Sequence, residues 1–309
     1  MSNDYQLGHR EISRVAVLTN PAAAKGRAVE ASNIAARAFY SYGVDVVRIF
    51  GSSSEVSRNL AREMVEDDSI DALVACGGNG FISLVLQEQA GSTTPLRIIP
   101  AGTGNDHARE YGIPLDARRA AKTIVQGFTT RTDLGIMRTD DGQQRYFGTI
   151  ACAGFDSLVT DRTNRIPWPS GQPRYVLAIL LDFINFHSLP TRITLDDGEV
   201  ISDEVTLCAI GNTRTYGGGM QVCPDTDHYD GLFDITLVSK MPRRKAALNV
   251  NKIFSGDFDD VAEARRYRTR KVRVEMPGIN AYADGDKYFA CPVECEIVPG
   301  AGYYLVPRP

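Results

Sequence analysis

Short apolar runs alternate with helical patterns through the first third of the chain, and no other feature narrows the fold as much. Each apolar run has the length of a buried strand, and the stretches between the runs show helical spacing. Strands that alternate with helices in this way form a parallel sheet covered by helices on both faces. The expected strands are Val15 to Thr19, Val44 to Phe50, Asp71 to Cys76 and Arg97 to Pro100, and the expected helices are Ala28 to Tyr42, Glu55 to Glu66 and Phe81 to Gln89.

A second pattern begins after about Asp133. Short strand-like runs follow one another there, separated by turns such as Asp196-Asp197-Gly198, which is typical of an antiparallel domain. Helices are expected only near Tyr175 to Phe186 and after Pro242. At 309 residues the chain is long enough for two domains. The expected strands of this part are Thr191 to Leu195, Glu204 to Ile210, Phe233 to Val238, Lys271 to Met276 and Cys295 to Val298.

The composition is that of a globular protein, with 43% hydrophobic and 23% charged residues. A net charge of −4 argues against general nucleic-acid binding, because that affinity comes mostly from neutralising phosphates. Met1 to Arg14 lack the apolar core of a signal peptide, and the longest apolar run, Tyr175 to Leu181, is far shorter than the ~20 residues of a membrane span. The six cysteines are scattered, as reduced core thiols would be. We therefore expect a cytoplasmic protein.

Three loops that follow expected parallel strands carry glycine or other small residues. They are Asn20 to Gly26, which includes Lys25, then Cys76 to Phe81, and then Pro100 to Asp106. Glycines let backbone N–H groups approach an anion, and a helix N-terminus adds a favourable dipole. Any one loop could be a tight turn without a ligand. Because the carboxyl ends of parallel strands meet at one edge, the three together predict a site for a phosphate chain. The loop Cys76 to Phe81 is not a P-loop, since no Gly-Lys-Ser/Thr follows its glycines.

The order of motifs along the chain resembles that of the bacterial diacylglycerol kinase and lipid kinase family, and is most similar to its soluble actinobacterial members. The resemblance extends from about Arg14 to Pro307. The motifs that carry it are Asn20-Pro21, Gly77-Gly78-Asn79-Gly80, Ile99 to Asp106, Gly154-Phe155-Asp156, Tyr216 to Met220, Pro224, Asp230-Gly231-Leu232 and Asp284-Gly285-Asp286.

The resemblance implies two domains and an ATP- and Mg²⁺-dependent lipid kinase whose active site lies between them. An NAD-kinase-like, three-layer α/β domain over 1–135, to which the tail 300–309 returns, would bind ATP. An antiparallel β-sandwich over 136–299 would take diacylglycerol or a related lipid alcohol. With the loop residues added, the expected ATP-binding set is Asn20, Pro21, Ala22, Ala23, Ala24, Gly77, Gly78, Asn79, Gly80, Phe81, Ile82, Ser83, Leu84, Thr103, Gly104, Asn105 and Asp106.

The chain departs from the family pattern at four positions. Asn79 stands where an aspartate is usual, Phe81 where a threonine is usual, and Ala24 where a glycine is usual. The family's glutamate base is the shorter Asp286. The alternative hypotheses are therefore a catalytically weakened nucleotide- or lipid-binding relative, a kinase of another alcohol such as NAD, and, least of all, a nicotinamide-dependent reductase.

A carboxylate must accept the proton of the lipid hydroxyl, and the resemblance assigns this role to Asp286. Asp284 would orient it. Period-two spacing would place both on one face of a strand, although Gly285 could make this stretch a turn and leave a solvated hairpin tip. The resemblance also implies a Mg²⁺ bound by Asp230 and by carbonyls of Asp227 and Leu232. Turn aspartates without a metal are the alternative.

Two basic runs could meet a membrane, namely Arg243-Arg244-Lys245 and the segment Arg265 to Arg273, in which six of nine residues are basic. Solvated faces are the simpler interpretation. Anionic headgroups nevertheless attract basic segments, so we expect peripheral contact with anionic lipid at the inner face of the plasma membrane. The apolar segment Tyr175 to Phe186, with Trp168 before it, could cover a lipid tail or pack in the core. A homodimer stays open, since no residue decides it.

Overall fold

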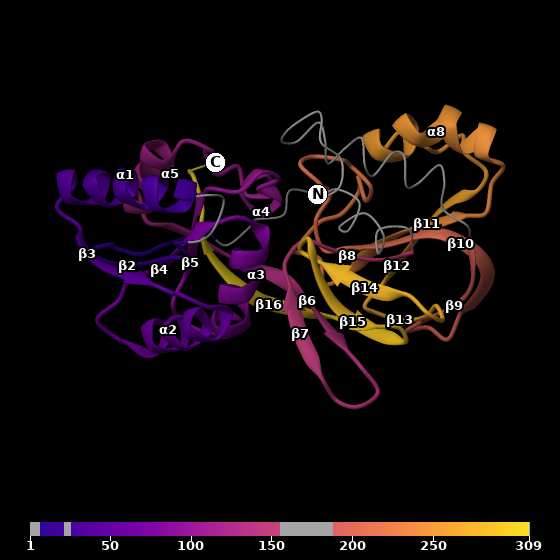
Figure 1. Ribbon diagram of the computed structural model, residues 1–309, viewed down its shortest axis with the longest axis horizontal. Coiled ribbons are helices and arrows are strands. Elements are labelled where there is room, and N and C mark those ends of the chain that lie inside the picture. Colours follow the sequence, from indigo (N-terminus) through magenta and orange to yellow (C-terminus); the bar gives the residue numbers. More distant parts are fainter. Residues whose placement is uncertain (1–6, 22–25, 155–187, 309) are drawn as a thin grey trace. The chain divides into compact units, whose positions relative to one another are not determined.

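The computed structural model describes residues 7–21, 26–154 and 188–308 (Figure 1). The chain divides into two compact units. Unit 1 comprises Met1–Leu134 and Pro299–Pro309, and unit 2 comprises Gly135–Val298. The strands β6 (Phe128–Arg138) and β16 (Val293–Leu305) each contribute residues to both units.

Unit 1 is built on a parallel sheet in the order β3-β2-β4-β5, as the alternating pattern predicts. Its central strands are fully buried and, apart from Arg97 on β5, consist of apolar residues and glycine, which is the pattern of a sheet covered on both faces. The C-terminal end of β16 extends this sheet, because Tyr304 pairs with Leu96 in parallel. The strands are β2 (Arg14–Thr19), β3 (Asp45–Phe50), β4 (Ala72–Gly77) and β5 (Leu96–Pro100), and the short β1 (Gly8–His9) pairs with β6.

Helices cover both faces of this sheet, with α1 and α5 on one face and α2 on the other (Figure 1). The three expected helices are confirmed as α1 (Arg27–Ser41), α2 (Ser54–Glu66) and α3 (Asn79–Gln89). Two more were not expected, α4 (Asp106–Glu110) and α5 (Ala117–Val125). The buried residues of α5, namely Ala117, Ala120, Ala121 and Ile124, keep a helical spacing, and its N-cap Asp116 accepts a hydrogen bond of 2.8 Å from the Arg119 amide.

A buried arginine ties the C-terminal tail into unit 1. Arg97 on β5 is fully buried, and its guanidinium donates to the Leu305 carbonyl and to the Thr123 hydroxyl of α5. Burial lowers the pKa of Arg97 to about 9. One side chain therefore links a central strand, a covering helix and the returning tail.

Unit 2 is antiparallel throughout its described strands, as the second pattern predicts. The long strand β10 pairs with β9, β8 and β11 in turn, and β12 adds to β11. Helix α8 (Arg243–Ser255) is the helix expected after Pro242. The helix expected near Tyr175 to Phe186 lies outside the described residues, as does Trp168. The strands are β7 (Gln144–Phe147), β8 (Ile150–Gly154), β9 (Leu189–Leu195), β10 (Val200–Gly211), β11 (Phe233–Ser239), β12 (Ala264–Thr269), β13 (Lys271–Glu275), β14 (Asn280–Ala283) and β15 (Asp286–Ala290).

Two apolar cores hold unit 2 together. The larger gathers residues from most of the strands around Phe147 and Phe233, whose rings stack with centroids 5.7 Å apart. The smaller lies where α8 packs, through Ala246, Val250 and Ile253, on side chains of β10 and β11. The outward-facing side of α8 is therefore separated from the core by a full helix diameter.

All six cysteines are free, as expected. Burial raises the pKa of the Cys76 thiol to about 12, so it packs as an inert apolar group. No helix within the described ranges is both long enough and apolar enough to span a bilayer.

Candidate active site

Two glycine loops of unit 1 touch through their backbones at the carboxyl ends of β4 and β5. A Cβ atom on Gly102 would lie 2.6 Å from the Cα of Gly78, and one on Gly78 would lie 3.1 Å from the Cα of Gly102. A Cβ on Gly77 would meet the Phe81 ring at 2.7 Å. The loops can approach this closely only because these positions lack side chains.

Asn105 braces the second loop from within. Its amide accepts from the Gly102 N–H at 2.9 Å and donates to the Gly102 carbonyl at 3.1 Å. Its backbone is left-handed, with φ of 53°, a region in which asparagine is enriched among residues with a side chain. The residue type that follows the glycines is thus explained by the shape of the loop.

Asn79 and Asp106 join the two loops by a reciprocal pair of hydrogen bonds. The Asn79 carbonyl oxygen accepts from the backbone N–H of Asp106 at 2.9 Å, and the Asn79 amide donates to the Asp106 carboxylate at 2.5 Å. Asp106 is buried and Asn79 is half-buried. The side chain that departs from the family pattern therefore complements its neighbour.

The other expected ATP-binding residues differ in what they can offer. Phe81, Ile82 and Ser83 are buried in the core, so only their backbone could reach a ligand. Thr103 is exposed, and Leu84 is half-buried. The Gly104 carbonyl accepts from the Arg109 guanidinium at 3.0 Å. Gly80 lies in the first turn of α3, whose backbone N–H groups have no acceptor within the helix.

The third loop follows β2 and is described only in part. Asn20 and Pro21 come directly after the strand, with Pro21 exposed. Ala22, Ala23, Ala24 and Lys25 lie outside the described residues, so their expected contacts stay predictions. Helix α1 begins just beyond the loop, after a left-handed Gly26.

The loops of unit 1 can therefore present backbone N–H groups to an anion. Helices α1 and α3 both begin at the carboxyl edge of the sheet, and the first turn of α3 carries no acid. A helix N-terminus favours negative charge nearby.

In unit 2, Asp284 and Asp286 belong to a hairpin between β14 and β15. Asp284 and Gly285 form a two-residue turn, with φ of 54° and 83°, and Ala283 pairs with Asp286. Asp-Gly is the usual pair for such a turn. The expectation that both aspartates share one face of a strand is wrong, because the positive φ of Asp284 takes it out of the strand.

The carboxylate of Asp284 is a buried anchor for the hairpin. It accepts from the Thr149 N–H at 2.8 Å, from the Thr149 hydroxyl at 2.7 Å, and from the Gly148 N–H at 3.2 Å. The Tyr288 hydroxyl donates to the Tyr146 carbonyl at 2.8 Å and also lies 3.4 Å from this carboxylate. Asp284 therefore stabilises the turn that precedes Asp286. It does not orient Asp286 from the same face of a strand.

Asp286 begins β15 and is exposed on the surface of unit 2. Partial removal of water raises its pKa above the ordinary value, and the nearby Asp284 charge raises it further. Arg145 on β7 opposes both by attracting the carboxylate. The Arg145 guanidinium lies 4.0 Å above the Tyr288 ring. Sequence reasoning missed Arg145, since nothing links it to Asp286 before the strands are paired.

The expected metal ligands form a turn that an arginine already neutralises. Asp230 accepts from the Leu232 N–H at 2.9 Å and pairs with Arg268 through its other oxygen. Asp227 accepts from the Tyr229 N–H at 3.1 Å. As described, both Asp230 oxygens have donors, and Arg268 already neutralises the charge of this carboxylate.

Arg268 also pairs with Asp234, at 3.1 Å from its Nε atom. Burial raises the pKa of Asp234 to about 6, against the lowering effect of Arg268. One guanidinium thus serves two carboxylates. No group of three or more metal-binding side chains occurs within the described part of the chain.

Comparison with known proteins identifies both units. Residues 14–137 match the diacylglycerol kinase catalytic domain, and residues 149–305 match the YegS C-terminal NAD kinase beta sandwich-like domain. A diacylglycerol kinase from Mycobacterium tuberculosis is 46% identical over 306 residues, which cover 98% of each chain. The chain belongs to the diacylglycerol kinase family.

The chain is also similar to a more distant relative and to a solved structure. A probable lipid kinase YegS-like from Stenotrophomonas maltophilia is 29% identical over 265 residues, covering 82% of this chain and 84% of that one. A crystal structure of a diacylglycerol kinase from Bacillus anthracis superposes with a TM-score of 0.74 over 96% of this chain and 98% of that chain. Its sequence identity is 19%, so it supports the fold alone.

Replacing Asn79 by aspartate tests the link between the loops. In Asn79→Asp one oxygen can still accept from the Asp106 N–H, but the other faces the Asp106 carboxylate. We expect a loss of roughly 1–3 kcal/mol in the free energy of unfolding at neutral pH with a chelator present. Repulsion raises the folded-state pKa of the pair, so the loss should shrink as pH falls toward the ordinary carboxyl pKa.

Urea unfolding from acid to neutral pH, with and without Mg²⁺, makes this measurement. Asn79→Ala is the matched control, because it removes the same hydrogen bonds without adding charge, and its deficit should depend on pH less steeply than that of Asn79→Asp. A pH-independent deficit in Asn79→Asp would contradict the described pairing.

Asp284 allows a second test, in which two variants separate hydrogen bonding from backbone strain. Asp284→Asn keeps one acceptor and tolerates positive φ, whereas Asp284→Ala loses both advantages. We expect losses of about 1–3 kcal/mol for asparagine and ~1 kcal/mol more for alanine. Chemical unfolding measures both, with the exposed turn variant Asp197→Ala as control. Equal stability of Asp284→Ala and the wild type would refute the anchor.

Arg268 and a divalent ion compete for the same carboxylates, and Mn²⁺ binding followed by electron paramagnetic resonance distinguishes them. We expect Arg268→Gln to gain one Mn²⁺ in the absence of nucleotide, because Asp230 and Asp234 lose their counter-charge. Arg266→Gln, which removes a neighbouring paired arginine, should gain none. If the wild type bound one Mn²⁺ and Asp230→Asn lost it, the metal site expected from the sequence would stand and the role of Arg268 would fall.

Proposed function

We propose that the chain is a diacylglycerol kinase that transfers the γ-phosphoryl group of ATP to the hydroxyl of diacylglycerol and forms phosphatidic acid. The observation that carries the proposal is the 46% identity to a diacylglycerol kinase over 98% of both chains. The joined glycine loops of unit 1 support a phosphate site independently of that likeness. A lipid kinase of this family needs both capacities, an anion cradle and a base.

Backbone amides of unit 1 supply most of the proposed ATP contacts. The residues are the ones expected from the sequence, with the first turn of α3 and the Gly102-to-Asp106 loop at their centre. Phosphoryl transfer asks a protein mainly for positioning and charge stabilisation. Rigid loops suit that task because little order is lost when the phosphates bind.

Asp286 is the proposed general base. It would accept the proton of the lipid hydroxyl while that oxygen forms its bond to the γ-phosphorus and the bond to the ADP oxygen breaks. A carboxylate can do this only when deprotonated, and its raised pKa makes it a better proton acceptor. Asp284 acts as a positioning residue through the turn. The ATP residues belong to unit 1 and Asp286 to unit 2, so the reaction draws on both.

Mg²⁺ would accompany ATP and offset the charge of its phosphates. Asp106 is a carboxylate within the Gly102-to-Asp106 loop itself, and the Asn79 amide already donates to it. Binding of an ion by Asp227, Asp230 and Leu232 stays a prediction, which the Mn²⁺ experiment above decides.

Asn79 gives a reason to prefer an active kinase over a weakened relative. The substitution removes a carboxylate but preserves the join between the loops, because its amide donates to Asp106. A kinase of another alcohol, including NAD, is the second candidate. It would use the same ATP site, and turnover with a different acceptor tests it.

A lipid substrate places the enzyme at a membrane surface. We propose peripheral contact with anionic lipid at the inner face of the plasma membrane. A homodimer stays a prediction, and nucleic acid is not a proposed partner.

Turnover in mixed micelles tests the function. With Mg-ATP and diacylglycerol, the wild type should form phosphatidic acid, and Asp286→Asn should lose roughly 10²-fold or more in kcat, as expected when a general base is removed. Phosphatidic acid is measured by transfer of labelled phosphate. An inactive wild type would sink the proposal for this acceptor, and NAD in the same assay would test the alternative. Near-normal turnover of Asp286→Asn would exclude this base.

The pH dependence of Arg145→Gln provides a control that a merely structural role would not reproduce. Arg145 lowers the pKa of Asp286, so its removal raises that pKa. The acid limb of kcat/KM should therefore move to higher pH, while the rate at alkaline pH is kept. Arg192→Gln removes a comparable charge, paired with Glu275, and should leave the limb in place.

A further inference from the structure

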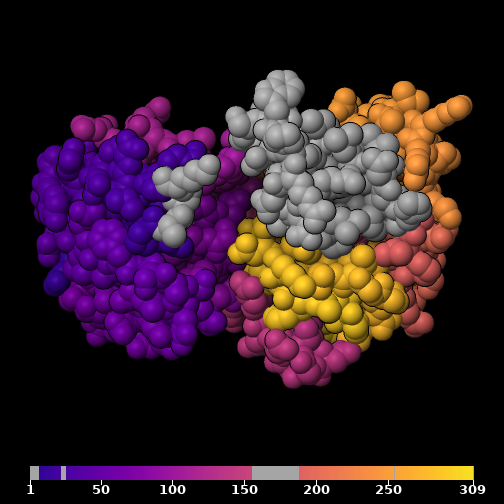
Figure 2. Space-filling view, viewed as in Figure 1, coloured from indigo at the N-terminus to yellow at the C-terminus, as the bar shows by residue number. Residues whose placement is uncertain are grey.

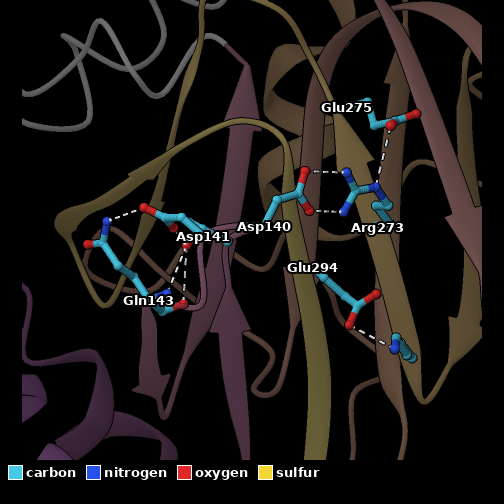
Figure 3. A network of polar contacts seen from close by, with 8 residues as sticks. Asp140, Asp141, Gln143, Arg273, Glu275 and Glu294 are labelled. Carbon is cyan, nitrogen blue, oxygen red and sulfur yellow. Dashed lines mark hydrogen bonds and ion pairs between the residues drawn. The ribbon is translucent and has the colours of Figure 1, made fainter.

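The two basic runs of unit 2 differ in how far acidic side chains neutralise them. In the run from Arg265 to Arg273, five of the six cations have carboxylate partners. Figure 3 shows one cluster, in which Asp140 binds Arg273 through both oxygens at 2.7 and 2.9 Å and Glu275 accepts from the same guanidinium. The pairs are Arg265 with Asp203, Arg266 with Asp225 and Asp259, Arg268 with Asp230 and Asp234, Lys271 with Glu294, and Arg273 with Asp140 and Glu275. This run therefore offers little surplus positive charge.

The run at the start of α8 is different. Lys245 pairs with Glu263 at 2.6 Å, but Arg243 and Arg244 have no ion-pair partner among the described residues. The first turn of α8 contains no acid, and Pro242 provides no side-chain cap. Cations at a helix N-terminus oppose the helix dipole, so helix stability does not explain these two arginines.

The same helix exposes a large apolar side chain. Leu248 is 80% exposed, more than any other large hydrophobic residue of the described chain. Helical spacing places Leu248 and Arg244 one turn apart on the face opposite Ala246 and Val250, which pack on the core. Figure 2 shows side chains of α8, in orange, standing at the surface of unit 2.

We propose that the outward face of α8, formed by Arg244 and Leu248, with the exposed Arg243 beside it at the start of the helix, docks on an anionic bilayer surface. The inference rests on the proposed function, in that the substrate is a lipid. Basic residues beside an exposed apolar side chain are what an interfacial helix needs, because headgroups attract the charges and the acyl boundary takes the apolar group. A stable protein interface needs about 800 Å² on each partner, and one leucine between polar neighbours offers no such apolar area.

Binding of the full chain to sedimented vesicles tests the proposal. Vesicles of phosphatidylcholine with phosphatidylglycerol should retain the wild type at low salt, and vesicles of phosphatidylcholine alone should not. Leu248→Ser should bind roughly tenfold more weakly, from loss of apolar burial. Arg244→Gln should bind about fivefold more weakly and show a smaller salt dependence. The matched controls are Leu115→Ser, an exposed leucine of unit 1, and Arg62→Gln, an arginine paired with Glu88.

Turnover on a short-chain diacylglycerol in detergent micelles separates this proposal from the proposed function. Leu248→Ser and Arg244→Gln should keep that activity and lose turnover on anionic vesicles. Wild-type retention by both variants, or no retention of the wild type, would overturn docking through α8 whatever the kinase activity. Loss of vesicle binding in the variants of a chain inactive on both substrates would uphold docking and count against the kinase. If Leu248→Ser changed only the sedimentation coefficient of the free protein, the face would be a contact between copies of the chain and docking would be overturned.

Discussion

The approach of Gly78 to Gly102 is the contact on which the candidate site depends. Two backbones can come this close only if neither residue has a Cβ. The side chains beside the two glycines then form hydrogen bonds that join the loops. Asn79 and Asp106 bond to each other, and Asn105 holds the second loop in shape. The two loops are therefore joined by hydrogen bonds without any bound phosphate.

Carboxylates of unit 2 are likewise engaged in hydrogen bonds and ion pairs within the fold. The Asp284 carboxylate accepts hydrogen bonds from the amides of Gly148 and Thr149 and from the Thr149 hydroxyl, and these bonds hold the turn before Asp286. Arg268 serves Asp230 and Asp234 together. Groups that could bind ligands are engaged in structure, and Asp286, the proposed base, begins a strand. This division separates positioning from chemistry.

Much of the fold could be predicted from the sequence, because the spacing of apolar residues and the positions of turn residues are local properties. The strands and the first three helices of unit 1 follow from alternating patterns, and the order of motifs predicted the family to which the chain belongs. Helix α5 was not predicted, although Ala117, Ala120, Ala121 and Ile124 keep a helical spacing in the sequence. The site residues were predicted because they lie in loops that follow strands. The hydrogen bonds between Asn79 and Asp106 were not predictable in this way, because they depend on strands that the fold brings together. From the sequence Asn79 looks like a lost carboxylate, and the basic run from Arg265 looks like a free patch, because the partners of both lie far along the chain.

Hydrogen exchange of the backbone amides, with and without Mg-ATP, tests the central claim most directly, namely that the joined glycine loops are the nucleotide site. The account predicts slower exchange in peptides that cover Gly77 to Leu84 and Gly102 to Asp106, and unchanged exchange in the β14–β15 hairpin of unit 2 when no lipid is present. ATP that binds without protecting either loop, or that protects only unit 2, would contradict it.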